Sequence, residues 1–288
     1  MEDITKMLHI SIVISTHNNF TYKNGCLESV ILAINNQINI NFETIIVDTA
    51  SDEKNIKFLQ RLHKKNPKIK VIYSIINNVS VGRNIGAKAA NSELILFLDD
   101  DVLLPEKDIL EQLVKQAKNK EYGLSATRLW TFKGWYQKNK KFLNEKITQK
   151  ACDYAIPTSE PNPEVRRKKN DRHLIRTYIG NFGFIKKSAL IDVGYWDEYY
   201  EGYGREDNAM AFKLYMKYGK PAILEELCVI HVWHEIAKEK YEQLEKNKKI
   251  FDRLLKENRI EKFHIGRILY NKDDVVEFID RNQVNPST

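Results

Sequence analysis

The chain has 288 residues, of which 42% are hydrophobic and 30% charged, a composition typical of a soluble globular protein. No stretch approaches the roughly 18 consecutive apolar residues of a membrane-spanning helix, and the short acidic N-terminus lacks the features of a signal peptide. The net charge of +7 suits an anionic ligand or contact with an anionic membrane surface.

The first half of the chain alternates segments that have the patterns of strands and helices. Apolar, β-branched runs predict strands over residues 8–15, 42–47, 69–74 and 94–98. Amphipathic or alanine-rich stretches predict helices over residues 26–35, 53–65, 82–91 and 108–118. This alternation predicts an α/β fold, with a mainly parallel, twisted sheet and helices on both of its faces.

The pattern changes beyond the predicted helix 108–118. Residues 154–176 contain three prolines and the basic cluster 166–169 without periodicity, which predicts a lid or a binding loop. Order then resumes, and the later predicted elements are a segment over 178–185, a helix over 207–218 and a strand over 222–232. We therefore expect a main domain over residues 1–234, with halves over 8–122 and 123–234, and a helical C-terminal extension over 235–288.

Three consecutive carboxylates, Asp99, Asp100 and Asp101, follow the apolar run 94–98. They would repel one another unless a positive charge lay among them. A hard divalent cation, Mg2+ or Mn2+, takes carboxylate oxygens and often shares its shell with substrate phosphates. Ligands of open α/β sheets bind at the carboxyl ends of the strands, where these acids would lie. The alternative is a solvated turn in which an Asp caps the next helix.

Other polar residues are also expected at strand ends: the segment 16–19, Asp48, and Arg83 with Asn84. Because such ends converge on one crevice in a doubly wound sheet, these side chains are candidates for a shared site. Asp48 can accept hydrogen bonds from a base or ribose, and Arg83 can donate to a carbonyl or phosphate. An Asp at a strand end is nevertheless more often a cap than a ligand.

The ordered set of motifs resembles a family 2 glycosyltransferase, with the GT-A fold, joined to a segment similar to the galactosyltransferase C-terminal region. The N-terminal motifs are SIVISTHNN (11–19), IIVDTASD (45–52), GRNIGA (82–87) and LFLDDD (96–101). The C-terminal motifs are GNFGFI (180–185), GYWDE (194–198) and GYGRED (202–207). Together they span about residues 8–234, and Ser15 departs from the proline that the family often has there.

The resemblance implies that residues 8–122 form the nucleotide-sugar-binding half. The residues that would contact the uracil and ribose are Thr16, Asn19, Asp48 and Arg83. The acidic run would be a DxD motif that holds the ribose and the metal. In that motif Asp99 would contact ribose and metal, Asp101 would contact the metal directly, and Asp100 would be the least essential donor contact.

The resemblance assigns catalysis and acceptor binding to residues 123–234. Glu206 and Asp207 open a predicted helix, at its positive end, although acids in a first helical turn are common. The aspartate of such a pair is the usual base in the similar galactosyltransferase segment. Asp207 would therefore remove the acceptor proton and Glu206 would orient the acceptor.

Two histidines follow the last predicted strand. Within a strand His231 and His234 would face opposite sides, so both can be ligands only if the chain bends. The resembling families place one metal-binding histidine here, which implies His231 as a metal ligand and His234 as a second candidate for metal or diphosphate. Trp196 and Tyr203 are candidates for acceptor contact, since aromatic rings suit sugar C–H faces, although core packing explains Trp196 equally well.

The resemblance therefore implies a metal-dependent, inverting glycosyltransferase that uses Mn2+ or Mg2+. It would move a hexosyl or N-acetylhexosaminyl group from a nucleotide-sugar, most simply a UDP-sugar, to a hydroxyl of a saccharide, lipid-linked saccharide or peptide. The well-separated cysteines, without paired spacing, indicate a reducing cytoplasm: Cys26, Cys152 and Cys228. The implied setting is polysaccharide biosynthesis, with peripheral association at the inner face of the membrane.

Two alternatives stay open at this point. One is a non-catalytic protein that binds nucleic acid or acidic glycan through the basic cluster 166–169, whereas the favoured interpretation expects no nucleic acid. The other is a nucleotidyltransferase, which normally needs a glycine-rich phosphate loop after the first strand. Residues 16–19 contain no glycine, which disfavours that second alternative.

Overall fold

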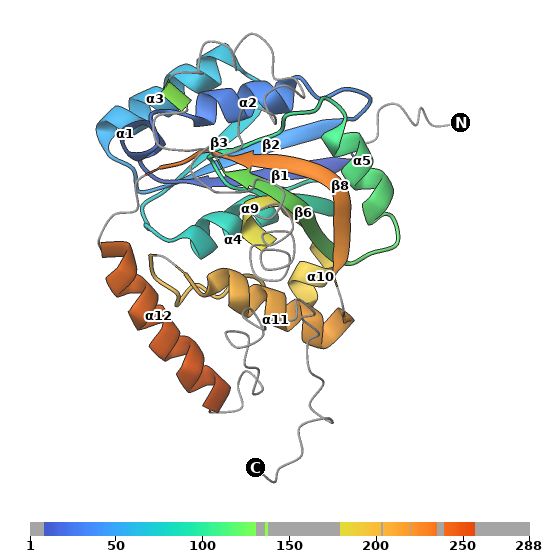
Figure 1. Cartoon of the computed structure of the whole chain (residues 1–288). Helices are drawn as coiled ribbons and strands as arrows, with labels where there is room; N and C mark the ends of the chain where they lie inside the picture. Colours follow the sequence, from blue (N-terminus) through green and yellow to red (C-terminus); the bar gives the residue numbers. More distant parts are fainter. Residues whose placement is uncertain are drawn as a thin grey trace, which may run out of the picture.

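The computed structural model describes residues 9–130, 136–137, 179–202, 204–219, 221–234 and 239–256. These residues form an eight-stranded sheet with helices on both faces (Figure 1). The strand order is β3-β2-β1-β4-β7-β6-β8-β5. This arrangement confirms the predicted α/β class.

The elements follow the predicted alternation in the first half of the chain. The strands are β1 (Ile10–Thr16), β2 (Phe42–Thr49), β3 (Ile69–Ser74), β4 (Leu94–Leu98), β5 (Val102–Leu103), β6 (Tyr122–Trp130), β7 (Gly183–Lys186) and β8 (Ala222–His231). The helices are α1 (Asn19–Tyr22), α2 (Leu27–Asn35), α3 (Glu53–Lys65), α4 (Val79–Ala89), α5 (Ile109–Ala117), α9 (Ile179–Phe182), α10 (Lys187–Asp192), α11 (Glu206–Tyr218) and α12 (Glu239–Lys256).

The sheet is mostly parallel, with antiparallel pairs in its second half. Strands β3, β2, β1 and β4 run parallel, and the register pairs Thr16 with Asp48 at the ends of β1 and β2. Strand β7 runs antiparallel to β4 and β6, and β5 runs antiparallel to β8, whereas β6 and β8 are parallel. The carboxyl ends of β1, β2 and β4 therefore lie along one edge of the sheet, where ligands bind in such folds.

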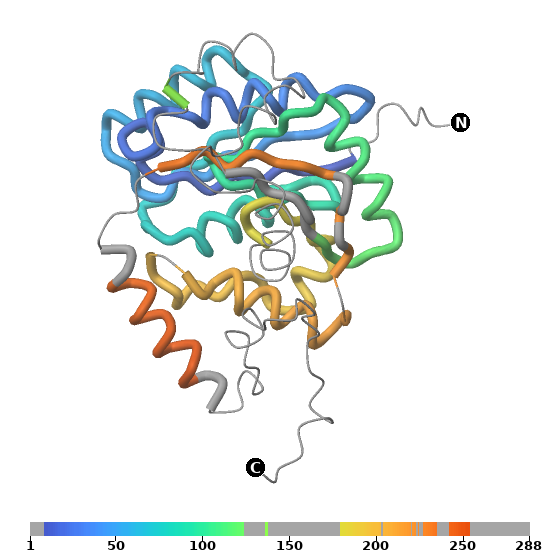
Figure 2. The backbone as a smooth tube through the Cα atoms, in the orientation of Figure 1, coloured from blue at the N-terminus to red at the C-terminus, as the bar shows by residue number. Residues whose placement is uncertain are grey.

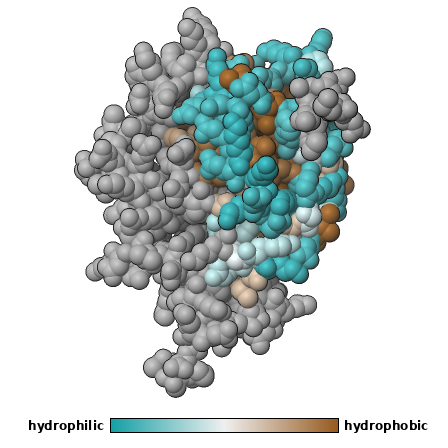
Figure 3. Space-filling view, turned by 90° about the vertical axis from the view of Figure 1, so that its right-hand side faces the viewer, coloured by the Kyte–Doolittle hydropathy of each residue, from teal (hydrophilic) through white to brown (hydrophobic). Residues whose placement is uncertain are grey.

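Each face of the sheet is covered by its own hydrophobic core. On one face Ile10, Ile12 and Ile14 pack with α2, α3 and α5, and on the other face Val13 packs with α4, α10 and α11. This division follows from the alternation of side chains along a strand. Figure 1 shows α2 and α3 above the sheet and α4, α9 and α11 below it. Hydrophilic residues cover most of the described surface on the side shown in Figure 3.

Helix α4 lies unusually close to the sheet. A Cβ atom at Gly82 would collide with the side chain of Ser15, and one at Gly86 would collide with Val13. The helix begins earlier than the predicted residue 82, because the Asn78 side chain accepts a hydrogen bond from the amide of Val81 and caps it. The close packing brings Arg83 to the strand ends.

Helix α12 extends from below the sheet, beside the segment that leads into α11 (Figure 2). Within the described ranges, the helices are all too short or too polar to cross a membrane. Cys26 and Cys228 are buried thiols. Several predicted features lie outside the described residues: the loop 154–176 with its basic cluster, Cys152, Tyr203 and residues 257–288.

Candidate active site

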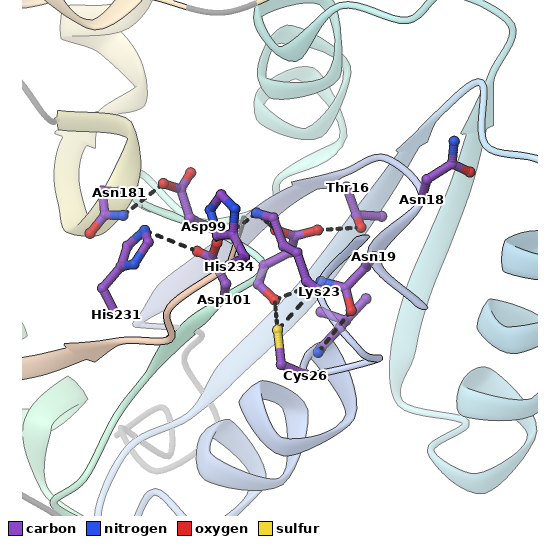
Figure 4. Close-up of polar contacts among 12 residues, drawn as sticks. Thr16, Asn18, Asn19, Lys23, Cys26, Asp99, Asp101, Asn181, His231 and His234 are labelled. Atoms are coloured by element: carbon purple, nitrogen blue, oxygen red, sulfur yellow. Dashed lines mark hydrogen bonds and ion pairs between the residues drawn. The ribbon is translucent and has the colours of Figure 1, made fainter. Parts of the chain in front are cut away.

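The three carboxylates after β4 each have a different set of partners. Figure 4 shows Asp99 and Asp101 with theirs. Asp99 is bonded on two sides by Asn181: its amide donates to the Asn181 carbonyl (3.1 Å), and the Asn181 side chain donates to its Oδ2 (2.7 Å). Asp100 and Asp101 are almost fully buried, with 3% and 1% exposure. The run is therefore packed into the fold and is not a solvated turn.

Asp101 lies against the two histidines that follow β8. The pairing of β5 with β8 places Val102 opposite His231, and the amide of Val232 donates to the Asp101 carbonyl (2.8 Å). Strand β8 ends at His231, so the chain turns and both rings face the same carboxylate. Nε2 of His231 lies 3.5 Å from Asp101 Oδ1, and Nε2 of His234 lies 3.2 Å from Oδ2.

These three residues can hold a divalent ion. One ligand atom of each lies within 4.8 Å of the others. Burial disfavours ionisation of Asp101, but His231, Lys23 and His234 outweigh burial and hold the pKa of Asp101 well below its usual range. A carboxylate that stays charged next to two imidazoles is a suitable donor set for a metal.

Side chains of three other residues hold the carboxylate and the backbone carbonyl of Asp100 in place. Its carboxylate accepts from the Thr16 hydroxyl (2.6 Å) and pairs with the Lys23 ammonium (2.6 Å), while Asn19 donates to its backbone carbonyl (3.0 Å). Lys23, which follows α1, also pairs with Asp101 Oδ2 at 2.7 Å. Lys23 therefore places a positive charge of the chain itself between Asp100 and Asp101.

Replacing Lys23 with Met is expected to lower the free energy of unfolding by about 3 kcal/mol, since it leaves two buried carboxylates without their ammonium partner. Burial alone would lower the pKa of Lys23, but Asp100 and Asp101 raise it well above its ordinary value, so the loss applies throughout neutral pH. Urea unfolding measures the effect. The exposed Lys57→Met is the control, and equal stability of the two variants would contradict the expectation.

A second cluster surrounds Arg83, which is 4% exposed. Its guanidinium lies 3.3 Å from Asp99 Oδ1, 3.3 Å from Asp207 Oδ1 and 3.6 Å from Glu206 Oε1. The amide of Gly180 also donates to Asp207 (3.0 Å), and a Cβ at Gly180 would collide with the guanidinium. Arg83 therefore joins the acidic run to the start of α11.

The electrostatic environment of the cluster keeps its carboxylates easy to protonate. Burial raises the pKa of Asp207 to about 7, and Glu206 and Asp99 add to this rise while Arg83 opposes it. Burial also raises the pKa of Glu206 and of Asp99, again against the effect of Arg83. Asp207 can therefore both take up and release a proton near neutral pH.

The predicted donor contacts on β1, α1 and β2 differ in how many of their polar atoms already have hydrogen-bond partners. Asp48 is 1% exposed; its Oδ2 accepts from the Ser51 amide (3.2 Å), and its Oδ1 has no hydrogen-bond partner among the described residues. The Thr16 hydroxyl is bonded to Asp100. Asn19, predicted to contact the nucleotide, is buried and uses its amide to join the Asp100 carbonyl and the Leu27 amide. Thr16 and Asn19 thus hold Asp100 in place through hydrogen bonds within the fold.

Trp196 packs in the core, which is one of the two alternatives that the sequence left open for it. It is 2% exposed and packs edge-on against Phe97, with ring centroids 5.2 Å apart. The Arg83 guanidinium lies 4.4 Å from its ring centroid, so Trp196 supports Arg83 from the core.

Lys23 and Asn181 were not among the predicted site residues. A single Lys in a loop carries no signal, whereas Asn181 lies within a quoted motif.

Comparisons with known proteins identify the family of the chain. The sequence matches the profile of Glycosyl transferase family 2 over residues 11–194. EpsH of Bacillus subtilis, a protein named as a glycosyltransferase, is 32% identical over 108 residues, which cover 38% of this chain and 30% of EpsH. The poly-beta-1,6-N-acetyl-D-glucosamine synthase of Staphylococcus epidermidis is 27% identical over 175 residues, which cover 60% of this chain and 39% of that protein. The chain thus matches well under half the length of these relatives.

Solved structures share the fold at low sequence identity. The mannosyltransferase PcManGT from Pyrobaculum calidifontis, in complex with GDP-Man and Mn2+, has a TM-score of 0.58 at 15% identity, covering 90% of this chain and 66% of that one. S. aureus TarS 1–349, in complex with UDP-GlcNAc, has a TM-score of 0.52 at 16% identity, covering 82% and 64%.

The fold is therefore the GT-A fold of nucleotide-sugar transferases. The chain belongs to family 2 of the glycosyl transferases, since the family profile matches more than half of it. The family is the one that the sequence motifs predicted.

Proposed function

We propose that this chain is a metal-dependent transferase that moves a sugar from a UDP-sugar to a hydroxyl group with inversion at the anomeric carbon. The observation that carries the proposal is the position of Arg83, 3.3 Å from both Asp99 and Asp207. A carboxylate of the donor-side acidic run and a candidate base thus belong to one buried cluster.

Asp207 suits the role of the base. Its pKa of about 7 allows it to accept a proton at physiological pH, which is what efficient general-base catalysis requires. The acceptor hydroxyl gives its proton to Asp207 and its oxygen bonds to the anomeric carbon. The bond between that carbon and the diphosphate oxygen breaks, and UDP leaves with the electron pair. Glu206 would orient the acceptor hydroxyl beside Asp207.

Asp101, His231 and His234 would hold the metal, with Asp99 contributing to metal and ribose. When bound, the ion would neutralise charge on the diphosphate leaving group. Imidazole ligands disfavour Mg2+, which prefers oxygen, so we favour Mn2+. The relation to PcManGT, whose structure holds Mn2+ with GDP-Man, supports this choice.

Asp48 would bind the uracil or ribose through its Oδ1, for which the described part of the chain offers no hydrogen-bond partner. TarS, with the same fold, binds UDP-GlcNAc, which supports a UDP-linked donor of the hexosyl or N-acetylhexosaminyl type. We further propose a saccharide, lipid-linked saccharide or peptide hydroxyl as acceptor, with Tyr203 as a contact. The enzyme would act in the cytoplasm at the inner face of the membrane, where its charge of +7 suits anionic lipids.

Thermal-shift measurements with UDP-sugars, each with and without Mn2+, test the proposal. The correct donor should raise Tm only when Mn2+ is present. At a donor concentration of 100 times Kd, binding stabilises the folded state by about 2.7 kcal/mol. Asp101→Asn should remove this metal-dependent shift, while Asp192→Asn, at an exposed carboxylate of α10, should keep it. The assignment is wrong if Asp101→Asn and Asp207→Asn both transfer sugar at wild-type rates.

A further inference from the structure

Helix α12 packs directly on the short segment that leads into α11. A Cβ atom at Gly202 would collide with the side chain of Gln243, and one at Gly204 would lie 2.5 Å from Leu244 Cδ1. The missing side chains of these glycines let the α12 side chains rest on the backbone itself. Helix α12 therefore contacts the segment that ends at the proposed catalytic pair, Glu206 and Asp207.

The backbone of the segment has a conformation that needs outside support. Gly202 and Gly204 have φ angles of 68° and 91°, and Arg205 has a φ of 76°, which is unfavourable for a residue with a side chain. Arg205 is the N-cap residue of α11, and its side chain makes no capping hydrogen bond. The first turn of α11, which carries both proposed catalytic carboxylates, is thus fixed by contacts from elsewhere.

Asn247 of α12 supplies such a contact. It is 2% exposed, and its Nδ2 donates to the carbonyls of Glu201 and Gly204, at 2.9 Å each. One amide group therefore joins two points of the segment, the carbonyls of residues 201 and 204. Four residues further along α12, Phe251 lies under the Arg205 guanidinium, with 5.9 Å to the ring centroid.

We infer that α12 belongs to the catalytic apparatus and that Asn247 is a positioning residue, which sets Glu206 and Asp207 against Arg83 through the backbone of Glu201 and Gly204. This inference rests on the proposed role of Asp207 as base. The distances that Asn247 controls are those of Arg83 to Asp207 (3.3 Å) and to Glu206 (3.6 Å). Misplacement of a reacting group by about 1 Å can cost roughly a hundredfold in rate.

Asn247→Asp in the full chain is the sharpest variant, because Asp has nearly the same volume but faces the two carbonyls without a donor. Asn247→Ala removes the amide without adding charge, and Glu245→Gln, at an exposed position of the same helix, is the control. Sugar transfer from a UDP-sugar with Mn2+ is followed as UDP release across pH. Hydrogen exchange of residues 204–214 is measured by mass spectrometry.

Both Asn247 variants should lower kcat at least tenfold and leave KM for the donor within about twofold, with Asp the more severe. The acid limb of the pH profile should shift, because the distance between Asp207 and Arg83 changes, and exchange over residues 204–214 should quicken. A fall in kcat no greater than in the control, or unchanged exchange, overturns the inference. Failure of the wild type to turn over any UDP-sugar overturns the proposed function instead. Faster exchange over residues 204–214 in the Asn247 variants would then still show that Asn247 fixes the start of α11, and unchanged exchange would overturn that as well.

Discussion

Asp207→Asn is expected to lower kcat for sugar transfer by about 10³-fold while the affinity for UDP stays within about twofold of wild type. A positioned general base contributes roughly 10²- to 10⁴-fold to the rate, and an amide at this position cannot accept the proton of the acceptor hydroxyl. The Asp207 carboxylate is only 14% exposed, next to the Arg83 guanidinium, so solvent offers no ready substitute. Single-turnover kinetics and calorimetry with UDP measure the two quantities.

The pH profile of the wild type provides an independent check on the same residue. Burial raises the pKa of Asp207 to about 7, and a base works only when it is ionised. Activity should therefore fall as the pH drops through about 7, with the slope of a single proton. Asp192→Asn should keep this limb, whereas the residual activity of Asp207→Asn should lack it. A limb that persists in Asp207→Asn would assign the base to another group.

The parallel half of the fold could be predicted because its strands are continuous apolar runs. The predicted bounds of β3, β4 and α3 agree with the structure, because each segment is bounded by polar or turn residues. Strand β5, with two residues, is too short to carry a pattern. Strand β6 alternates apolar and small residues only in its first part, so its full length was not predictable.

The acidic residues of the site could be located from the sequence, but their partners could not. Asp99, Asp100 and Asp101 share one motif, yet each has a different environment, since Asn181, Lys23 and the two histidines arrive from separate elements. The strand pattern alone placed His231 and His234 on opposite sides. Both reach Asp101 only because β8 ends at His231, which depends on its pairing with β5.

The roles of buried side chains near the site were the hardest to predict, because these roles also depend on partners from other elements. A motif shows that Asn19 and Trp196 belong to the site region, but it does not distinguish a ligand contact from a support. Asn19 completes the backbone around Asp100, and Trp196 packs beneath Arg83. The difference is one of depth below the surface, which only the packing of the helices on the sheet determines.

Arg83→Met is expected to be the most damaging substitution for stability. Arg83 is the cation that compensates Asp99, Glu206 and Asp207, and its side chain is only 5% exposed. Removing one partner from a buried ionic cluster typically costs about 3–5 kcal/mol, because the remaining charges are left without compensation. Met keeps the contact with the Trp196 ring, so the loss reports mainly on charge. Arg83→Lys, which keeps the charge, should lose much less.

The size of the loss should depend on pH in a defined direction. Without the guanidinium, the carboxyl pKa of Asp207 in the folded state should rise above the value of about 7 that burial already gives it. A group whose folded pKa is raised stabilises the protein at low pH, and this stability is lost as the pH rises through that pKa. The deficit of Arg83→Met should therefore be larger at pH 8.5 than at pH 5.5 in urea unfolding. Arg61→Met, at an exposed position of α3, should show no such dependence. A deficit that is equal at both pH values would mean that Arg83 contributes by packing, and not by compensating the three carboxylates.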